Sequence, residues 1–72
     1  MNENVVRTYN FSGKMMYERS FVSGDEGATA AYKEYCDIID NCKRTLPKGY
    51  GVTVVRFRWG KVMTEGTVIG TH

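Results

Sequence analysis

The sequence has few of the residues on which enzymes and metal proteins depend. Among its 72 residues there are one proline, two cysteines and one histidine, and the histidine is the last residue, His72. A general acid–base site needs a positioned titratable group, and a tetrahedral metal site needs converging ligands. Two cysteines and a terminal histidine supply neither, so we expect no enzyme activity, no bound metal and no cofactor.

The sequence also has no long apolar run, and we expect no secretory leader. The segment from Met1 to Asn4 lacks the basic start and the apolar run of a signal peptide. Cys36 and Cys42 are six residues apart in an expected helix, which turns their side chains in different directions and disfavours a mutual disulfide. Free thiols favour a reducing compartment, so we expect a cytoplasmic protein with no membrane partner.

What is present is typical of one small folded domain, residues 1–72. Hydrophobic residues make up 42% of the chain and charged residues 25%, as in globular proteins. The net charge of +2 is too small to indicate nucleic acid as a partner. The charges are unevenly distributed, because residues 23–46 carry five acids and three bases and the other residues carry three acids and seven bases. An acidic region and a basic region therefore belong to different elements.

Residues 24–46 have the pattern of a long amphipathic helix. Ser23 stands three residues before Glu26, as in a capping box, and Pro47 closes the segment. Between them the apolar residues recur every three or four positions, at Ala28, Tyr32, Tyr35, Ile39, Cys42 and Leu46. The pattern predicts a helix of about 22 residues that begins near Gly24 and is the central packing element of the domain.

Two strand-like runs, 52–59 and 61–69, follow the helix and are separated at Gly60. We expect a hairpin with Gly60-Lys61 as its two-residue turn, which pairs Trp59 with Val62 and Arg56 with Glu65. In this register the face that covers the helix is formed by Thr53, Val55, Phe57, Trp59, Val62 and Val68. The other face is open and carries Val52, Val54, Arg56, Arg58, Met63, Glu65, Thr67 and Ile69.

The first hairpin, with strands at 5–11 and 15–22, allows two registers around Ser12-Gly13. A three-residue loop sets Arg7 opposite Arg19 and gathers on one face the side chains of Val5, Tyr9, Phe11, Met15, Tyr17 and Phe21. A two-residue loop pairs Arg7 with Glu18 and scatters those apolar side chains over both faces. We prefer the first register, because burying an apolar side chain contributes ~1.5 to 3 kcal/mol and one like-charge contact costs ~1 kcal/mol or less.

The predicted fold is therefore α+β with the order β-β-α-β-β, a four-stranded antiparallel sheet of two hairpins packed on one long helix. A single helix covers one face of such a sheet, so the open face is the candidate partner-binding surface. Its residues are Val52, Val54, Arg56, Arg58, Met63 and Ile69. This surface can serve as a homodimer interface, as a docking surface for a host protein, or as a base-stacking platform, although it has no exposed aromatic residue for stacking.

Arg7 and Arg19 are a second candidate site. In the preferred register they form a fork that can bind an anion through their guanidinium groups. The structural alternative is that each arginine pairs with acids such as those of the helix.

In size, hairpin-helix-hairpin order, tyrosine, methionine and free-cysteine usage, and lack of catalytic groups, the whole chain resembles the small accessory proteins with which tailed bacteriophages block host defences or toxins. The resemblance is one of general type and carries no residue signature. It implies a phage-encoded, non-enzymatic inhibitor, such as an anti-CRISPR or toxin-neutralising protein, that contacts a host protein or nucleoprotein complex in the host cytoplasm. We therefore predict a protein-binding inhibitor that acts as a homodimer. The alternative is a protein that sequesters a nucleotide or nucleic acid through a basic sheet surface with Arg7, Arg19, Arg56 and Arg58.

Overall fold

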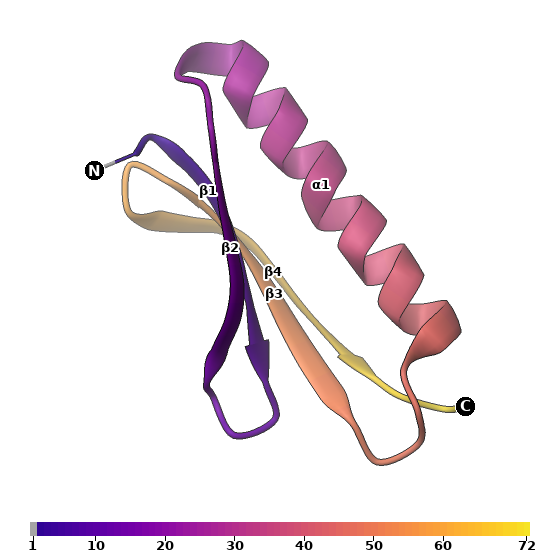
Figure 1. The fold of residues 1–72 in the computed structure, drawn as a ribbon. Coiled ribbons are helices and arrows are strands. Elements are labelled where there is room, and N and C mark those ends of the chain that lie inside the picture. The colour runs from indigo at the N-terminus through magenta and orange to yellow at the C-terminus, as the bar shows by residue number, and fades with distance from the viewer. Residues whose placement is uncertain (1) are drawn as a thin grey trace.

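One continuous sheet contains both hairpins. In the computed structural model, which describes residues 2–72, the chain forms β1 (Asn4–Asn10), β2 (Met15–Phe21), α1 (Gly24–Thr45), β3 (Gly51–Arg58) and β4 (Lys61–Ile69). All neighbouring strands are antiparallel and their order is β2-β1-β3-β4, so β1 and β3 are central. The helix lies across one side of the sheet, and the described residues form no second layer on the other side (Figure 1). The predicted α+β fold with its β-β-α-β-β order is confirmed.

The helix begins and ends where the sequence indicates, but its N-terminus is held differently. Ser23 occupies the N-cap position without a side-chain hydrogen bond, so the predicted capping box does not form. Instead, the Glu3 carboxylate accepts a hydrogen bond of 3.0 Å from the backbone N–H of Gly24. The buried Asn4 donates through Nδ2 to the carbonyl groups of Val22 and Gly24, at 2.9 and 3.3 Å. The start of β1 thus replaces the capping box and anchors the helix to the sheet.

The core lies between α1 and the central strands. Val6, Ala31 and Val54 are fully buried, and the side chains packed against them are Phe21, Tyr35, Ile38, Ile39 and Val52. Tyr35 and Ile39 therefore pack as the predicted apolar stripe indicates. Tyr32, from the same stripe, is 50% exposed. The buried side of the helix is centred on Gly27 and Ala31, because these small residues bring the helix backbone close to the sheet.

The second hairpin turns one residue earlier than predicted. Its turn residues are Trp59 and Gly60, with φ of 54° and 75°, and a two-residue turn of the type I′ kind needs positive φ at both positions. Beyond the turn, the pairing between β3 and β4 shifts by one residue between Phe57 and Arg56. Phe57 pairs with Val62, and Arg56 pairs with Thr64 rather than with Glu65. The predicted Gly60-Lys61 turn and the pairing built on it are wrong.

The helix covers the opposite face of β3 from the one predicted, whereas most of β4 lies as predicted, with Val68 on the helix side and Glu65, Thr67 and Ile69 on the uncovered side. Val52 and Val54 lie under α1, so the alternating side chains of Thr53, Val55 and Phe57 point to the uncovered side. The physical reason is the one-residue change in register. Gly66 faces the helix in both registers, and a Cβ on that glycine would lie 2.7 Å from Tyr35 Oη and 2.8 Å from Ile39 Cδ1. In the structure it pairs with Val54, so Val54 rather than its neighbour Val55 faces α1.

The first hairpin combines features of both expected registers. Its loop has three residues, Phe11–Gly13, and is closed by a 2.9 Å hydrogen bond from the N–H of Asn10 to the carbonyl of Lys14. A register shift next to the loop then brings Arg7 opposite Glu18. The preferred pairing of Arg7 with Arg19 is therefore wrong, and the alternative pairing is correct. The Asn10 side chain fixes this loop, because its Oδ1 accepts hydrogen bonds from the N–H groups of Ser12 and Lys14.

Candidate functional sites

The structure disperses the predicted partner-binding residues. Val54 is fully buried, and Val52 is partly buried against the core under α1, so neither belongs to an uncovered sheet face. Ile69 is half exposed on the side of the sheet away from α1, where it pairs with Gly51. Met63 is half exposed on the helix side of the sheet, and two other members of the predicted set, Arg56 and Arg58, lie beside it. The predicted residues therefore do not form one patch on an open face, although Arg56, Arg58 and Met63 meet in a groove described below.

The uncovered side of the sheet, called the open face here, is different from the one expected. Side chains that share a cross-strand pair share a face. By this rule the open face is formed by Val5, Arg7 and Tyr9 of β1, Met15, Glu18 and Ser20 of β2, Thr53, Val55 and Phe57 of β3, and Val62, Glu65, Thr67 and Ile69 of β4. It carries the aromatic residues that the predicted open face lacked.

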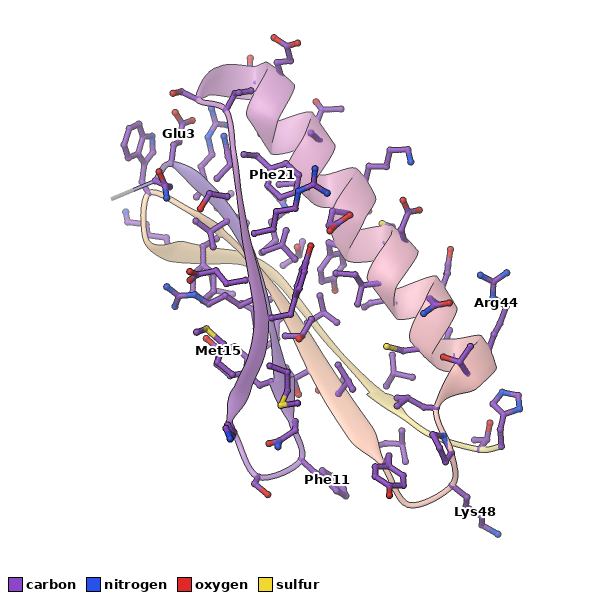
Figure 2. The ribbon with its side chains drawn as sticks, viewed as in Figure 1. Glu3, Phe11, Met15, Phe21, Arg44 and Lys48 are labelled. Carbon is purple, nitrogen blue, oxygen red and sulfur yellow. The ribbon has the colours of Figure 1, made fainter. Side chains whose placement is uncertain are left out.

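Large apolar side chains gather at one end of the open face, next to the β1–β2 loop. Phe11 is 70% exposed, Ile69 52% and Met15 48%. A Cβ on Gly51 would lie 3.1 Å from the Phe11 ring and 3.3 Å from Ile69 Cδ1, so these two side chains flank the same glycine. Figure 2 shows Phe11 projecting at the tip of the first hairpin and Met15 on the side of the sheet away from the helix. We call Phe11, Met15 and Ile69 the apolar end.

The centre of the open face is a row of charges across the strands. Arg7 pairs with Glu18 through its Nε, and its guanidinium lies 5.0 Å from the centre of the Phe57 ring. Hydrogen bonds with Tyr9 and Glu18 raise the pKa of Arg7. Glu65 lies in the same row, beyond Val55. The row therefore holds two carboxylates and one guanidinium, which makes the middle of the open face acidic.

The predicted anion-binding fork of Arg7 and Arg19 does not form. The two side chains point to opposite sides of the sheet, because Arg19 pairs with Val6, which lies under the helix. Arg19 is 3.5 Å from Glu34 of α1 and stacks on Phe21 at 4.9 Å. The alternative interpretation, in which an arginine pairs with acids of the helix, is correct for Arg19.

A shallow groove of about 420 Å³ lies between the first turns of α1 and the second hairpin, and we call it the arginine groove. It is lined by Asp25, Ala28, Thr29, Tyr32, Arg56, Arg58 and Met63. Arg56 donates through Nε to Thr64 Oγ1 at 3.2 Å, and its guanidinium lies 5.4 Å from the centre of the Tyr32 ring. The groove brings together two arginines, an aromatic ring and the exposed thioether of Met63.

Arg58, which lines this groove, is held in place by the buried carboxylate of Glu3. Its Nε donates to Glu3 at 2.7 Å, and its Nη2 lies 3.3 Å from the exposed carboxylate of Asp25. The backbone N–H of Gly24, followed by Arg58, keeps the pKa of Glu3 below its ordinary value, although desolvation opposes this. Figure 2 shows Glu3 beside the start of the helix. Sequence reasoning missed Glu3, because a single acid before a strand belongs to no recognisable pattern.

The described residues contain no cluster of three or more histidine, cysteine or acidic side chains that could hold a metal ion. Cys36 and Cys42 are both free, as expected, and burial raises the pKa of the Cys42 thiol. Within residues 2–72 no helix is long and apolar enough to cross a membrane. Comparisons with protein-family models, with curated proteins and with solved structures find no match to this chain.

Proposed function

We propose that this chain is a non-enzymatic binding protein that makes a stoichiometric contact with a partner protein through its open face. The observation that carries the proposal is the apolar end, where three large side chains expose about half or more of their surface beside a sheet face with no second layer. Apolar groups gathered in this way mark interaction sites. The resemblance to phage accessory proteins supplies the partner class, a host defence or toxin protein.

The charge of the open face favours protein over nucleic acid. Tyr9 and Phe57 could stack on bases, but nucleic-acid affinity comes mainly from cations that neutralise phosphates. Arg7, the one arginine that residues 2–72 place on this face, is already paired with Glu18, and Glu65 adds a further negative charge. A protein surface with an apolar patch and a basic residue fits this pattern, and a phosphate backbone does not.

A homodimer through the same face is a second candidate. The charge row is self-complementary, because Arg7 and Glu65 lie on either side of Val55. If a second copy packs face to face about a two-fold axis parallel to β3, each Arg7 meets the Glu65 of the other copy. The homodimer expected from Val52 and Val54 is thereby moved to the opposite face of the sheet.

Light scattering and affinity capture distinguish these candidates. The test variants are Phe11→Ser and Ile69→Ser, and the control is Val22→Ser, which removes an exposed apolar side chain just before α1. We expect a monomer in solution that retains a protein partner from a bacterial lysate, in a fixed ratio that survives nuclease treatment. Both test variants should release this partner and the control should keep it.

Two results would contradict the proposal. If the parent chain is dimeric and Phe11→Ser is monomeric, the open face belongs to a second copy. If both test variants retain the partner as well as the parent does, the partner binds elsewhere on the chain.

A further inference from the structure

The arginines of the strands differ in how their charges are balanced. Three of them have a carboxylate within 4 Å, in the pairs Arg7–Glu18, Arg19–Glu34 and Arg58–Glu3. Arg56 has none among residues 2–72, although it is partly buried and lies on the helix side of a central strand. A guanidinium pairs favourably with a carboxylate or a phosphate. Arg56 therefore has a charge that an anion from outside the chain can balance.

The hydrogen bonds of Arg56 leave one edge of its guanidinium free. Its Nε is used by Thr64, and the plane of the group lies over the Tyr32 ring. No hydrogen bond joins either of its terminal nitrogens to the described residues. A guanidinium has five N–H donors in a rigid fork, so the remaining donors match the two oxygens of a carboxylate or phosphate.

The surroundings of Arg56 fit a small molecule with an apolar part. The volume of about 420 Å³ is within the range of roughly 300–1,000 Å³ that is typical of ligand sites. Tyr32 and Met63 are each half exposed on its walls. The side chain of Asp25 is 99% exposed and contacts Arg58 at 3.3 Å, so it puts a negative charge at the edge of the groove without pairing with Arg56.

We propose that the arginine groove binds a small organic anion. Its oxyanion, a phosphate or a carboxylate, is held by the free edge of Arg56, and its apolar or planar body lies against Tyr32 and Met63. The groove is on the helix side of the sheet, so this site is separate from the open face, and its test does not depend on the proposed protein partner.

The test is a titration followed by amide chemical shifts, with phenyl phosphate, benzoate and inorganic phosphate as probes. We expect saturable shifts at Thr29, Met63 and Thr64 with at least one organic probe, and weaker binding of inorganic phosphate, which has no apolar body. Whichever of phenyl phosphate and benzoate binds with the lower Kd shows whether the groove prefers a phosphate or a carboxylate. Failure of both organic probes to give saturable shifts in the groove would overturn the proposal.

Substitutions assign the binding to the groove. Arg56→Gln should weaken binding by about tenfold or more, because a charge-assisted hydrogen bond is lost, and Arg56→Lys should recover only part of the loss, since it keeps the charge without the fork. Asp25→Asn should tighten binding, because it removes a negative charge from the edge of the groove. The control Arg7→Gln, on the open face, should leave the affinity unchanged. Parent-like binding by a folded Arg56→Gln variant, or weaker binding by Asp25→Asn, would contradict the assignment.

Discussion

Replacing Gly27 with alanine gives the sharpest test of how the helix is joined to the sheet. In the interior of an exposed helix this substitution is favourable by about 1 kcal/mol. Here the new Cβ would lie 1.5 Å from the carbonyl oxygen of Val22 and 2.7 Å from Nδ2 of Asn4. A carbon and an oxygen normally stay about 3.3 Å apart or more, so the helix would have to move away from the end of β2 by nearly 2 Å.

That movement would lengthen or break the hydrogen bond from Asn4 to the carbonyl of Val22. Overpacking of this kind costs about 1–3 kcal/mol, and disturbing the two hydrogen bonds of the buried Asn4 amide, to Val22 and Gly24, costs about 1–3 kcal/mol more. After the gain in helix propensity is subtracted, Gly27→Ala should destabilise the domain by about 1–5 kcal/mol. A chain of 72 residues has a total stability of roughly 4–10 kcal/mol, so the variant loses a large share of it.

Urea denaturation followed by circular dichroism measures this change. The matched control is Ala30→Gly, which exchanges the same two residue types at an exposed position of α1 and should cost only about 1 kcal/mol. A Gly27→Ala variant that is as stable as the parent, or more stable, would refute the close approach between helix and sheet.

Three further changes test the core and the helix anchor. Val54→Asp places a charge in the centre of the core and should unfold the domain, because burying an unpaired charge costs several kcal/mol or more; Thr53→Asp, on the open face, should remain folded by circular dichroism. Ile39→Ala should lower the free energy of unfolding by about 2 kcal/mol, and an unchanged melting temperature would contradict its place beside Gly66. The folded pKa of Glu3 is lowered, so its contribution is complete above its unfolded value of about 4.3 and is lost as pH falls through the folded value. The difference in stability between the parent and Glu3→Gln should therefore narrow on acidification, and a constant difference would contradict the anchor.

The elements themselves could be predicted from local sequence. The spacing of apolar residues and the stop at Pro47 located the helix, and the runs of β-branched residues around Gly60 located the second hairpin. These signals depend on residues that are close in sequence, so they do not change with the way the elements pack together. The helix cap is the exception, because Ser23 is a good local candidate and the carboxylate of Glu3, which lies 21 residues before Gly24, takes its place.

The face of β3 could not be predicted, because it depends on the register of the second hairpin. With the turn at Gly60-Lys61, Gly66 would pair with Val55, and Val55 and Phe57 would face the helix. In the structure Gly66 keeps its place under the helix but pairs with Val54, so Val52 and Val54 face α1 instead. A glycine within a strand indicates either a bulge or a close contact, and Gly66 is in close contact with Tyr35 and Ile39.

The roles of Arg56 and Arg58 show how much of the candidate site depends on a single turn residue. With the turn at Gly60-Lys61, Arg56 would face Glu65 and Arg58 would be the free cation. With the turn at Trp59-Gly60 and the register shift beyond it, Arg56 faces Thr64 and Glu65 moves opposite Val55, onto the open face. The one-residue change in register therefore separates Arg56 from Glu65: it leaves Arg56 without a carboxylate partner in the arginine groove and puts Glu65 on the other side of the sheet, in the open face. Arg58 is neutralised by Glu3 across the start of β1. The proposed anion site and the acidic character of the open face thus have the same structural origin.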